Sequence, residues 1–259
     1  NGGRPLKGEV KVKGGKNAVL PILSATLLNG NECILKNCPD ISDVNNTIEL
    51  LKNMGCDVKK EKDTIIINSK YADDNFLDSK TASKMRSSIV FMGSMLGRFG
   101  GGIMPYPGGC NIGARPIDLH LKALKKMGTN IKEENEKIIF YTDGLKGCDI
   151  NLDFPSVGAT ENIMMAAVLA DGITTIYNCA REPEIVALQD FLNLMGANIK
   201  GAGSDIIVIK GVKKLNPVEF EIIPDRIETG TYMIGAAMTG GEIFIENAKK
   251  DIMVQTIMR

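Results

Sequence analysis

A cysteine in a glycine-rich loop is the residue of this sequence best placed to do chemistry. Cys110 follows Gly108 and Gly109, and Gly113, Arg115 and a helical pattern come after it. Glycines let a backbone approach a ligand closely, and a nearby cation lowers the pKa of a thiol. The loop therefore predicts a reactive cysteine, with a merely buried thiol as the alternative.

The chain that must position this loop repeats itself. A motif of the form Leu-x-x-Met-Gly ends at Gly55, Gly128 and Gly196, and an alternating apolar run that predicts a β-strand follows each copy. Each copy is preceded by a helical pattern and, further upstream, by another helix, a glycine and a strand. A fourth copy begins at residues 229–239. We predict a helix–strand–helix–strand unit in which the glycine after the methionine ends the second helix.

The second copy carries an insertion, and Cys110 lies in it. From the end of the upstream strand to the methionine, 17 positions separate Asn37 from Met54 and 21 separate Tyr106 from Met127. Insertions within a repeat fall on loops, often on the binding face. Cys38 and Cys179 occupy the uninserted place in their copies and are expected to be buried, structural thiols.

Composition narrows the class of protein. The 31 basic and 31 acidic residues balance, so no overall charge favours nucleic acid or membrane. No apolar run reaches spanning length, and six cysteines without disulfide-type or metal-type spacing indicate a reducing cytoplasm. The single histidine, His120, excludes a multi-histidine metal site and is expected to be packed or solvent-facing on the helix after the loop.

Six ordered motifs make the chain resemble the UDP-N-acetylglucosamine 1-carboxyvinyltransferase family, the enolpyruvyl transferases that open bacterial peptidoglycan synthesis. They lie at residues 14–21, 85–89, 107–120, 156–160, 180–185 and 224–231. The resemblance implies an α/β (α+β) fold: an inside-out α/β barrel lobe of three repeated subdomains, with helices inward and sheets outward. We expect this lobe at 16–227, with repeats at about 16–69, 85–144 and 157–212. Residues 1–15 and 228–259 would then be pieces of a second, similar lobe, and the chain a fragment.

The resemblance also implies a reaction. The 3′-hydroxyl of UDP-N-acetylglucosamine attacks C2 of phosphoenolpyruvate, C3 receives a proton, and phosphate leaves. Cys110 would be the proton donor and could add covalently to C2, which is the thiol that the antibiotic fosfomycin modifies. No metal and no organic cofactor is required. A cytoplasmic enzyme of cell-wall synthesis, and thus of cell shape and division, is expected. The general base of the second lobe does not occur in this sequence, so the fragment alone is expected to be inactive.

The binding residues follow from the same motifs. Those expected to contact the two anionic substrates are Lys16, Asn17, Arg86, Arg115, Pro116, Ile117, Asp118, Leu119, Ser156, Val157 and Gly158. Lys16 and Arg86 each stand near the start of a helical pattern, where free N–H groups favour anions. Some family members carry a lysine two residues before the serine, whereas this chain has Phe154 there, so a diphosphate contact is lost or replaced by a stacking surface.

Three other functions stay open at this stage. The sister 3-phosphoshikimate 1-carboxyvinyltransferase shares the fold and chemistry but lacks the inserted cysteine loop. A non-catalytic sugar-nucleotide-binding fragment would carry the lobe without the reaction. A cysteine hydrolase needs a base held by the fold, and the only histidine lies ten residues away on the next predicted helix.

Overall fold

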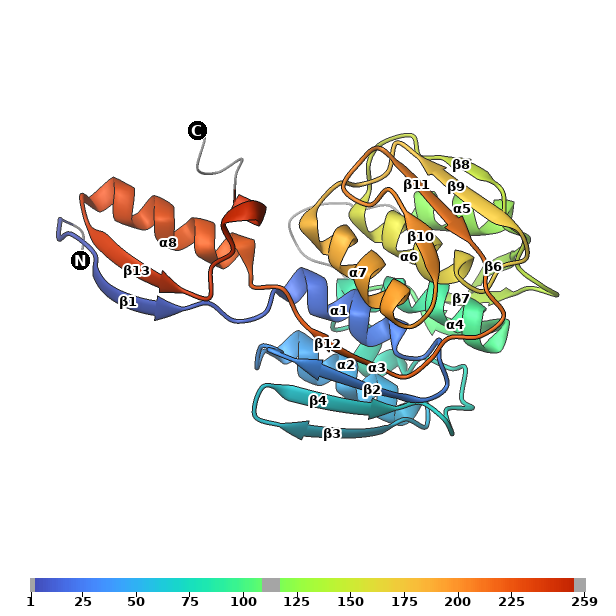
Figure 1. Cartoon of the computed structure of the whole chain (residues 1–259). Coiled ribbons are helices and arrows are strands. Elements are labelled where there is room, and N and C mark those ends of the chain that lie inside the picture. Colours follow the sequence, from blue (N-terminus) through green and yellow to red (C-terminus); the bar gives the residue numbers. More distant parts are fainter. Residues whose placement is uncertain (1–2, 109–116, 254–259) are drawn as a thin grey trace.

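The computed structural model describes residues 3–108 and 117–253, and three α/β units make up most of it (Figure 1). The first unit contains α1 (Lys16–Ala25), β2 (Glu32–Lys36), α2 (Ser42–Asn53), β3 (Asp57–Glu61), β4 (Thr64–Asn68) and the returning strand β12 (Val218–Glu221). The second contains α3 (Ser79–Ala82), η1 (Arg86–Val90), α4 (Phe91–Phe99), β5 (Gly101–Pro105), α5 (Asp118–Lys126), β6 (Asn130–Glu134) and β7 (Lys137–Tyr141). The third contains β8 (Asp149–Asn151), α6 (Val157–Ala167), β9 (Ile173–Tyr177), α7 (Pro183–Leu194), β10 (Asn198–Lys200) and β11 (Ile206–Lys210).

Each unit has its own sheet, built on the same antiparallel pattern. The strand orders are β12-β2-β4-β3, β5-β7-β6 and β10-β11-β9-β8. In the first and third sheets an additional strand pairs in parallel, β12 with β2 and β8 with β9. In the second sheet an isolated parallel bridge joins Phe76 to Ile103 of β5 instead.

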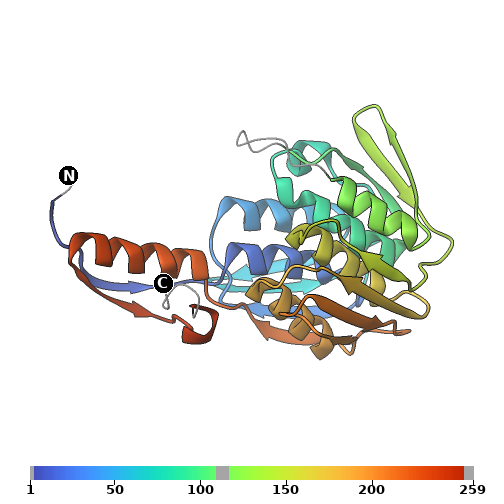
Figure 2. The same ribbon diagram turned by 90° about the horizontal axis from the view of Figure 1, so that it is seen from above.

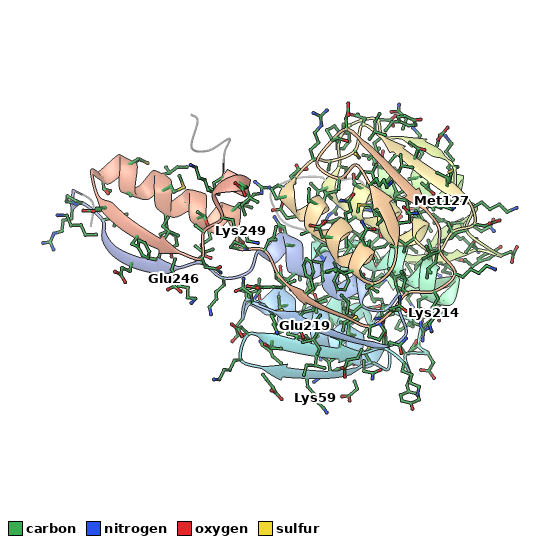
Figure 3. The ribbon with its side chains drawn as sticks, viewed as in Figure 1. Lys59, Met127, Lys214, Glu219, Glu246 and Lys249 are labelled. Carbon is green, nitrogen blue, oxygen red and sulfur yellow. The ribbon has the colours of Figure 1, made fainter. Side chains whose placement is uncertain are left out.

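The helices of the three units pack against one another inside the sheets (Figures 1 and 2). Helix α6 packs against α4, α5, α7 and η1, and every residue from Ala159 to Ala167 is buried. The sheets alternate buried and exposed residues, so one face covers the helices and the other faces water. Figure 3 shows two charged side chains of the first sheet, Lys59 and Glu219, on its outer side. The predicted α/β lobe with helices inward and sheets outward is confirmed.

A fourth, smaller group of elements lies to one side of the three units (Figure 1). It contains β1 (Lys7–Lys11), α8 (Arg226–Thr239), β13 (Glu242–Glu246) and η2 (Lys250–Met253). Strands β1 and β13 pair in parallel, although they come from opposite ends of the chain. Helix α8 covers one side of this pair (Figure 2), and only two of its residues, Thr229 and Gly230, are buried.

The predicted helix ends at the three glycines are confirmed. Gly55, Gly128 and Gly196 have φ values of 92°, 94° and 101°, in the left-handed region that glycine adopts without strain. The first helices of the copies differ in detail. Helix α1 is continuous to Ala25, whereas the second copy begins with the 3-10 turn η1 before α4.

Three asparagines follow corresponding strands in the first, third and fourth copies and adopt one conformation. Asn37, Asn178 and Asn247 have φ values of 58°, 54° and 66°. Each side-chain amide donates to a backbone carbonyl of a neighbouring segment, at Ile222 (2.9 Å), Leu152 (2.8 Å) and Val12 (2.9 Å) respectively. The second copy has Tyr106 at this position. It therefore lacks the asparagine hydrogen bond at the point where the insertion begins.

Candidate functional site

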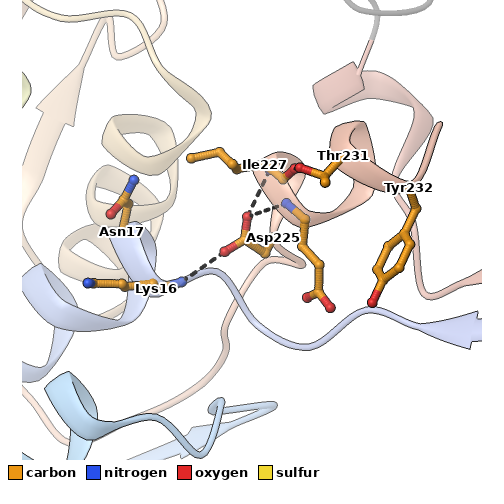
Figure 4. Close-up of a pocket in the computed structure, with 7 residues that line it drawn as sticks. Lys16, Asn17, Asp225, Ile227, Thr231 and Tyr232 are labelled. Atoms are coloured by element: carbon orange, nitrogen blue, oxygen red, sulfur yellow. Dashed lines mark hydrogen bonds between the residues drawn. The ribbon is translucent and has the colours of Figure 1, made fainter. Parts of the chain in front are cut away.

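Two segments of chain connect the small group of elements to the three units, and they run side by side. The N–H of Gly15 donates to the carbonyl of Ile223 (2.8 Å), and the N–H of Asp225 donates to the carbonyl of Lys13 (2.9 Å). Because α1 begins directly after the first segment and α8 directly after the second, the N-termini of these two helices come together (Figure 4).

A single carboxylate serves both helix ends. Asp225 Oδ1 accepts from the N–H groups of Ile227 (2.8 Å) and Glu228 (3.0 Å) and so caps α8. Its Oδ2 accepts from the N–H of Lys16, the first residue of α1 (3.3 Å). Figure 4 shows these three hydrogen bonds.

A pocket of about 450 Å³ opens at this junction. Its walls come from the first turn of α1 and the first two turns of α8: Lys16, Asn17, Asp225, Ile227, Glu228, Thr231 and Tyr232. The Lys16 ammonium forms an ion pair with Asp43 of α2, and its side chain remains half exposed. Two helix N-termini and one ammonium favour an anion, while Asp225, Asp43 and Glu228 oppose it. A small anion could therefore bind here only by displacing the carboxylates of Asp225 and Asp43 from these donors.

Arg86 lies elsewhere in the described structure. It begins η1, is half-buried, and is not among the residues that line the pocket at Lys16. Its charge acts on His120, where it helps to lower the pKa of the imidazole. The charge of Arg86 thus lies near His120 on α5.

A second group of predicted site residues lies at the N-termini of α5 and α6, which pack against each other. Ser156 caps α6 through its hydroxyl, which accepts from the N–H of Ala159 (3.4 Å), and Val157 and Gly158 form the first turn. On α5, Asp118 is exposed, but Ile117 and Leu119 are 8% and 4% exposed. The side chains of these two apolar residues belong to the hydrophobic core.

His120 is packed in the structure. Of the two predicted alternatives, packed and solvent-facing, the first is confirmed. It is 7% exposed on α5, and burial together with the charge of Arg86 lowers its pKa to about 4. A histidine with so low a pKa holds a proton only weakly near neutral pH. It is therefore a poor general base there.

Cys110, Arg115 and Pro116 lie outside the described residues, so their predicted roles stay predictions. Gly108, just before them, is described: a Cβ there would lie 1.7 Å from the carbonyl oxygen of Ser83, so only glycine fits. Cys38 and Cys179 are buried as predicted, at 2% and 1% exposure. Burial raises the pKa of Cys33, Cys38 and Cys56 to about 12 and also raises that of Cys148 and Cys179.

The sequence motifs did not identify every residue of the site. Asp225 stands directly before a helical pattern, which is the ordinary position of a helix cap, and this signal could have identified it. Asp43 and Tyr232 have no such signal, because their relation to Lys16 depends on how α2 and α8 pack. Among the described residues, no group of three or more His, Cys, Asp or Glu side chains could hold a metal ion. No helix in the described ranges is both long enough and apolar enough to cross a bilayer.

Comparison with known proteins relates this arrangement to one family. Residues 1–258 match the family model described as EPSP synthase (3-phosphoshikimate 1-carboxyvinyltransferase). A curated relative from Caldanaerobacter subterraneus subsp. tengcongensis, named UDP-N-acetylglucosamine 1-carboxyvinyltransferase 2, is 51% identical over 97% of this chain and 60% of its own length. One from Staphylococcus aureus, named UDP-N-acetylglucosamine 1-carboxyvinyltransferase 1, is 48% identical over 100% of this chain and 62% of its own. The chain thus spans about three fifths of the length of these relatives.

Solved structures share the fold at lower identity. The enolpyruvyl transferase NikO from Streptomyces tendae superposes with a TM-score of 0.78 at 22% identity, covering 90% of this chain and 55% of that one. EPSP synthase from Acinetobacter baumannii gives a TM-score of 0.74 at 20% identity, covering 96% of this chain and 57% of that one. At these identities the likeness concerns the fold alone.

Proposed function

The chain belongs to the EPSP synthase (3-phosphoshikimate 1-carboxyvinyltransferase) family, and from this we propose that it transfers the enolpyruvyl group of phosphoenolpyruvate to the 3′-hydroxyl of UDP-N-acetylglucosamine. One observation carries the choice of acceptor. Relatives named for UDP-N-acetylglucosamine are 48% to 52% identical along nearly the whole chain, whereas the EPSP synthase structure is 20% identical. Because the chain spans only part of those relatives, the activity is proposed for the protein as a whole.

The described geometry supports a site for anionic substrates. In the proposal, the pocket at the α1–α8 junction holds the phosphate or carboxylate of phosphoenolpyruvate, with Lys16 and the N-terminal N–H groups of α1 as donors. The first turns of α5 and α6, with Asp118, Ser156, Val157 and Gly158, hold the nucleotide. Arg86 and Arg115 add positive charge, because a planar guanidinium binds phosphate oxygens in pairs.

The proposed reaction is an addition followed by an elimination. The sugar hydroxyl gives its proton to the base that the second lobe would supply and forms a bond to C2 of phosphoenolpyruvate, while Cys110 gives its proton to C3. The phosphate then leaves with the electrons of its bond to C2, C3 returns a proton to the Cys110 thiolate, and the enol ether forms. We place this reaction in the cytoplasm at the first committed step of peptidoglycan synthesis, and we propose the thiol of Cys110 as the group that fosfomycin alkylates.

The domain assignment belongs to the same proposal. Residues 16–227 would form one lobe, and residues 1–15 and 228–259 would join a second lobe that supplies the base and further cations. Closure of two lobes would exclude water and strengthen the charge interactions with the substrates. We therefore expect residues 1–259 alone to bind the sugar nucleotide weakly and to release no phosphate.

Phosphate release tests the acceptor directly. The full-length protein is incubated with phosphoenolpyruvate and either UDP-N-acetylglucosamine or 3-phosphoshikimate. Release with the sugar nucleotide only is expected. Release with 3-phosphoshikimate only would favour the sister activity, and binding of the sugar nucleotide without release would favour a binding module.

The role of Cys110 is tested by two variants. Cys110→Asp keeps a group that can deliver a proton, so we expect measurable turnover and resistance to fosfomycin. Cys110→Ala has no such group and should lose far more activity. Equal turnover in Cys110→Ala and the wild type would remove Cys110 from the mechanism.

A further inference from the structure

Two consecutive residues at the start of α8 reach two different helices of the three units. The carboxylate of Asp225 accepts from the N–H of Lys16, the first residue of α1 (3.3 Å). Nε of Arg226 donates to both carboxylate oxygens of Glu184 in the first turn of α7 (3.0 Å and 3.3 Å). Because α1 and α7 pack against each other, the beginning of α8 is fixed to one pair of helices at two points.

The ion pair between Arg226 and Glu184 is largely shielded from water. Glu184 is 6% exposed, and the Arg226 side chain is 33% exposed. In the ion pair between Lys36 and Glu219, by contrast, both side chains are more than half exposed. An exposed ion pair contributes little to stability, whereas removal of one partner from a buried pair leaves an uncompensated charge. We therefore expect the contact between Arg226 and Glu184 to hold α8 and α7 together.

Other carboxyl groups near Glu184 increase its dependence on Arg226. Burial, then the charge of Glu184 and then that of Glu182 raise the pKa of Glu161, a buried residue of α6. Glu184 and the carboxyl group of Glu161 thus lie within electrostatic reach of each other. The N-terminus of α7 favours the charge of Glu184, and Arg226 is its ion-pair partner. Replacing Arg226 would remove the cation that offsets this group of carboxyls.

Apolar packing does little to fix the direction of α8 relative to the three units. The helix packs mainly against β13 and η2 of its own group, and Thr229 and Gly230 are its only buried residues. The two connecting segments pair through backbone hydrogen bonds at Gly15 and Asp225, and a crossing of two segments lets the attached parts rotate about it. The ion pair with α7 is a contact to a third segment, so it opposes such a rotation.

A cavity of about 1030 Å³ beside the ion pair separates the two parts of the structure. Arg226 lines this cavity, together with Pro183 and Val186 of α7 and Ile252 and Met253 of η2. Because the space is not filled by packed side chains, movement of α8 relative to α7 would break few apolar contacts. The ion pair bridges the starts of the two helices at the edge of this space.

We propose that Glu184 is a positioning residue for the anion pocket at the α1–α8 junction: through Arg226 it fixes the direction of α8, and so the place of the Asp225 carboxylate beside Lys16. An anion that enters the pocket must take the Lys16 N–H from Asp225, and it is held best when the N-termini of α1 and α8 keep one separation. If α8 moves, the anion meets one helix end at a time and binds more weakly. The inference rests on the proposed function for the identity of that anion, phosphoenolpyruvate.

Kinetics of the full-length protein test this role. Glu184→Gln keeps the shape of the side chain and removes its charge, so we expect the KM for phosphoenolpyruvate to rise about tenfold and the KM for UDP-N-acetylglucosamine to stay within about twofold. A merely structural role would lower the melting temperature without separating the two KM values. Glu219→Gln removes the same charge from the exposed pair with Lys36 and is the matched control, with both KM values unchanged. A KM for phosphoenolpyruvate that stays at the wild-type value or falls in Glu184→Gln would overturn the proposal, as would an equal rise in both KM values.

Substitutions of Arg226 test whether Glu184 acts through it. Arg226→Gln should raise the KM for phosphoenolpyruvate as Glu184→Gln does, and Arg226→Lys, which keeps the positive charge, should restore part of the loss. In the double variant of Glu184→Gln and Arg226→Gln the rise should be no larger than in the more affected single variant, because both substitutions remove the same ion pair. Effects that multiply in the double variant would show that the two residues act independently and would overturn the proposal.

The amide signal of Lys16 in nuclear magnetic resonance gives a test that does not depend on the reaction. In full-length protein labelled with ¹⁵N-lysine, Lys16→Arg identifies this signal. Glu184→Gln and Arg226→Gln should shift it and speed its exchange with solvent, because the Asp225 carboxylate moves away from the Lys16 N–H, whereas the control Glu219→Gln should not. If the wild type releases no phosphate with phosphoenolpyruvate and UDP-N-acetylglucosamine, the proposed function is wrong, and this signal still decides the inference. A Lys16 signal that is unchanged in both variants would overturn it.

Discussion

The backbone N–H of Lys16 donates to the carboxylate of Asp225 at 3.3 Å, although 209 positions separate the two residues. The same carboxylate caps α8, so one side chain links the beginnings of two helices that belong to different parts of the fold. The pocket proposed for phosphoenolpyruvate opens at this link. The geometry of an anion site here thus depends on Asp225 as much as on Lys16.

Replacing Asp225 by alanine should destabilise the protein by about 1 kcal/mol, because three N–H groups at helix ends lose their acceptor. Urea denaturation of the wild type and of Asp225→Ala measures the effect. Asp225→Asn is the matched control, since an asparagine oxygen can still cap α8, and it should lose less stability. Equal midpoints for Asp225→Ala and the wild type would show that water replaces the cap without cost.

Two glycines of α4 should respond differently to alanine. A Cβ at Gly93 would lie 2.3 Å from the backbone oxygen of Asn162, so Gly93→Ala must push α4 away from α6 and should cost about 3 kcal/mol. A Cβ at Gly97 would meet the end of the flexible Leu28 side chain at 2.7 Å, and the gain in helix propensity offsets the adjustment. Thermal unfolding of the two variants tests this, and a Gly93→Ala variant as stable as Gly97→Ala would contradict it.

Glu161 should make stability fall as the pH rises. Burial, followed by the charges of Glu184 and Glu182, raises the pKa of this carboxyl well above its ordinary value of 4.5. Between pH 4.5 and the raised pKa of the folded protein, the unfolded chain loses this proton while the folded chain keeps it. The free energy of unfolding therefore falls as the pH rises through this range. Glu161→Gln has no proton to lose.

Melting temperatures at about pH 4.5 and about pH 8 test the role of Glu161. The variant and the wild type should be similar at the lower pH, and the variant should melt several degrees higher at the upper pH. A wild type that gains stability relative to Glu161→Gln as the pH rises would show that the folded state favours the charged carboxylate.

The buried hydroxyl of Thr174 in β9 has no hydrogen-bond partner among the described residues, and the side chain is 1% exposed. Thr174→Val removes this polar atom at nearly constant shape, so we expect a stabilisation of about 1 kcal/mol. Thr175→Val, on the opposite face of the strand, is the control and should change little. Loss of stability in Thr174→Val would indicate that a water molecule satisfies the hydroxyl.

Thiol reactivity should separate the described cysteines from Cys110. The raised pKa values of Cys33, Cys38 and Cys56, about 12 each, leave almost no thiolate near neutral pH. Brief treatment with iodoacetamide followed by peptide mass spectrometry should therefore modify Cys110 first. Early modification of Cys38 or Cys179 would contradict both their burial and the predicted activation of Cys110.

Local patterns in the sequence were sufficient for the elements and their threefold repetition. Apolar residues at helical or alternating spacing recur in each unit, and glycines such as Gly55 and Gly196 end helices at corresponding places, because both signals depend on residues close together in the chain. The insertion at Cys110 was visible for the same reason, since a count of positions between Tyr106 and Met127 needs no coordinates. The sequence alone thus determined the class of fold, the repeat and the candidate loop.

Only the tertiary structure decided which of the candidate residues meet. It buries the side chains of Ile117 and Leu119 and brings Asp225 to the first turn of α1. It also surrounds His120 with Asn162 and Gly158, from another helix. Such contacts depend on how helices far apart in the chain pack, and the spacing of residues within a helix does not record which other helix lies against it.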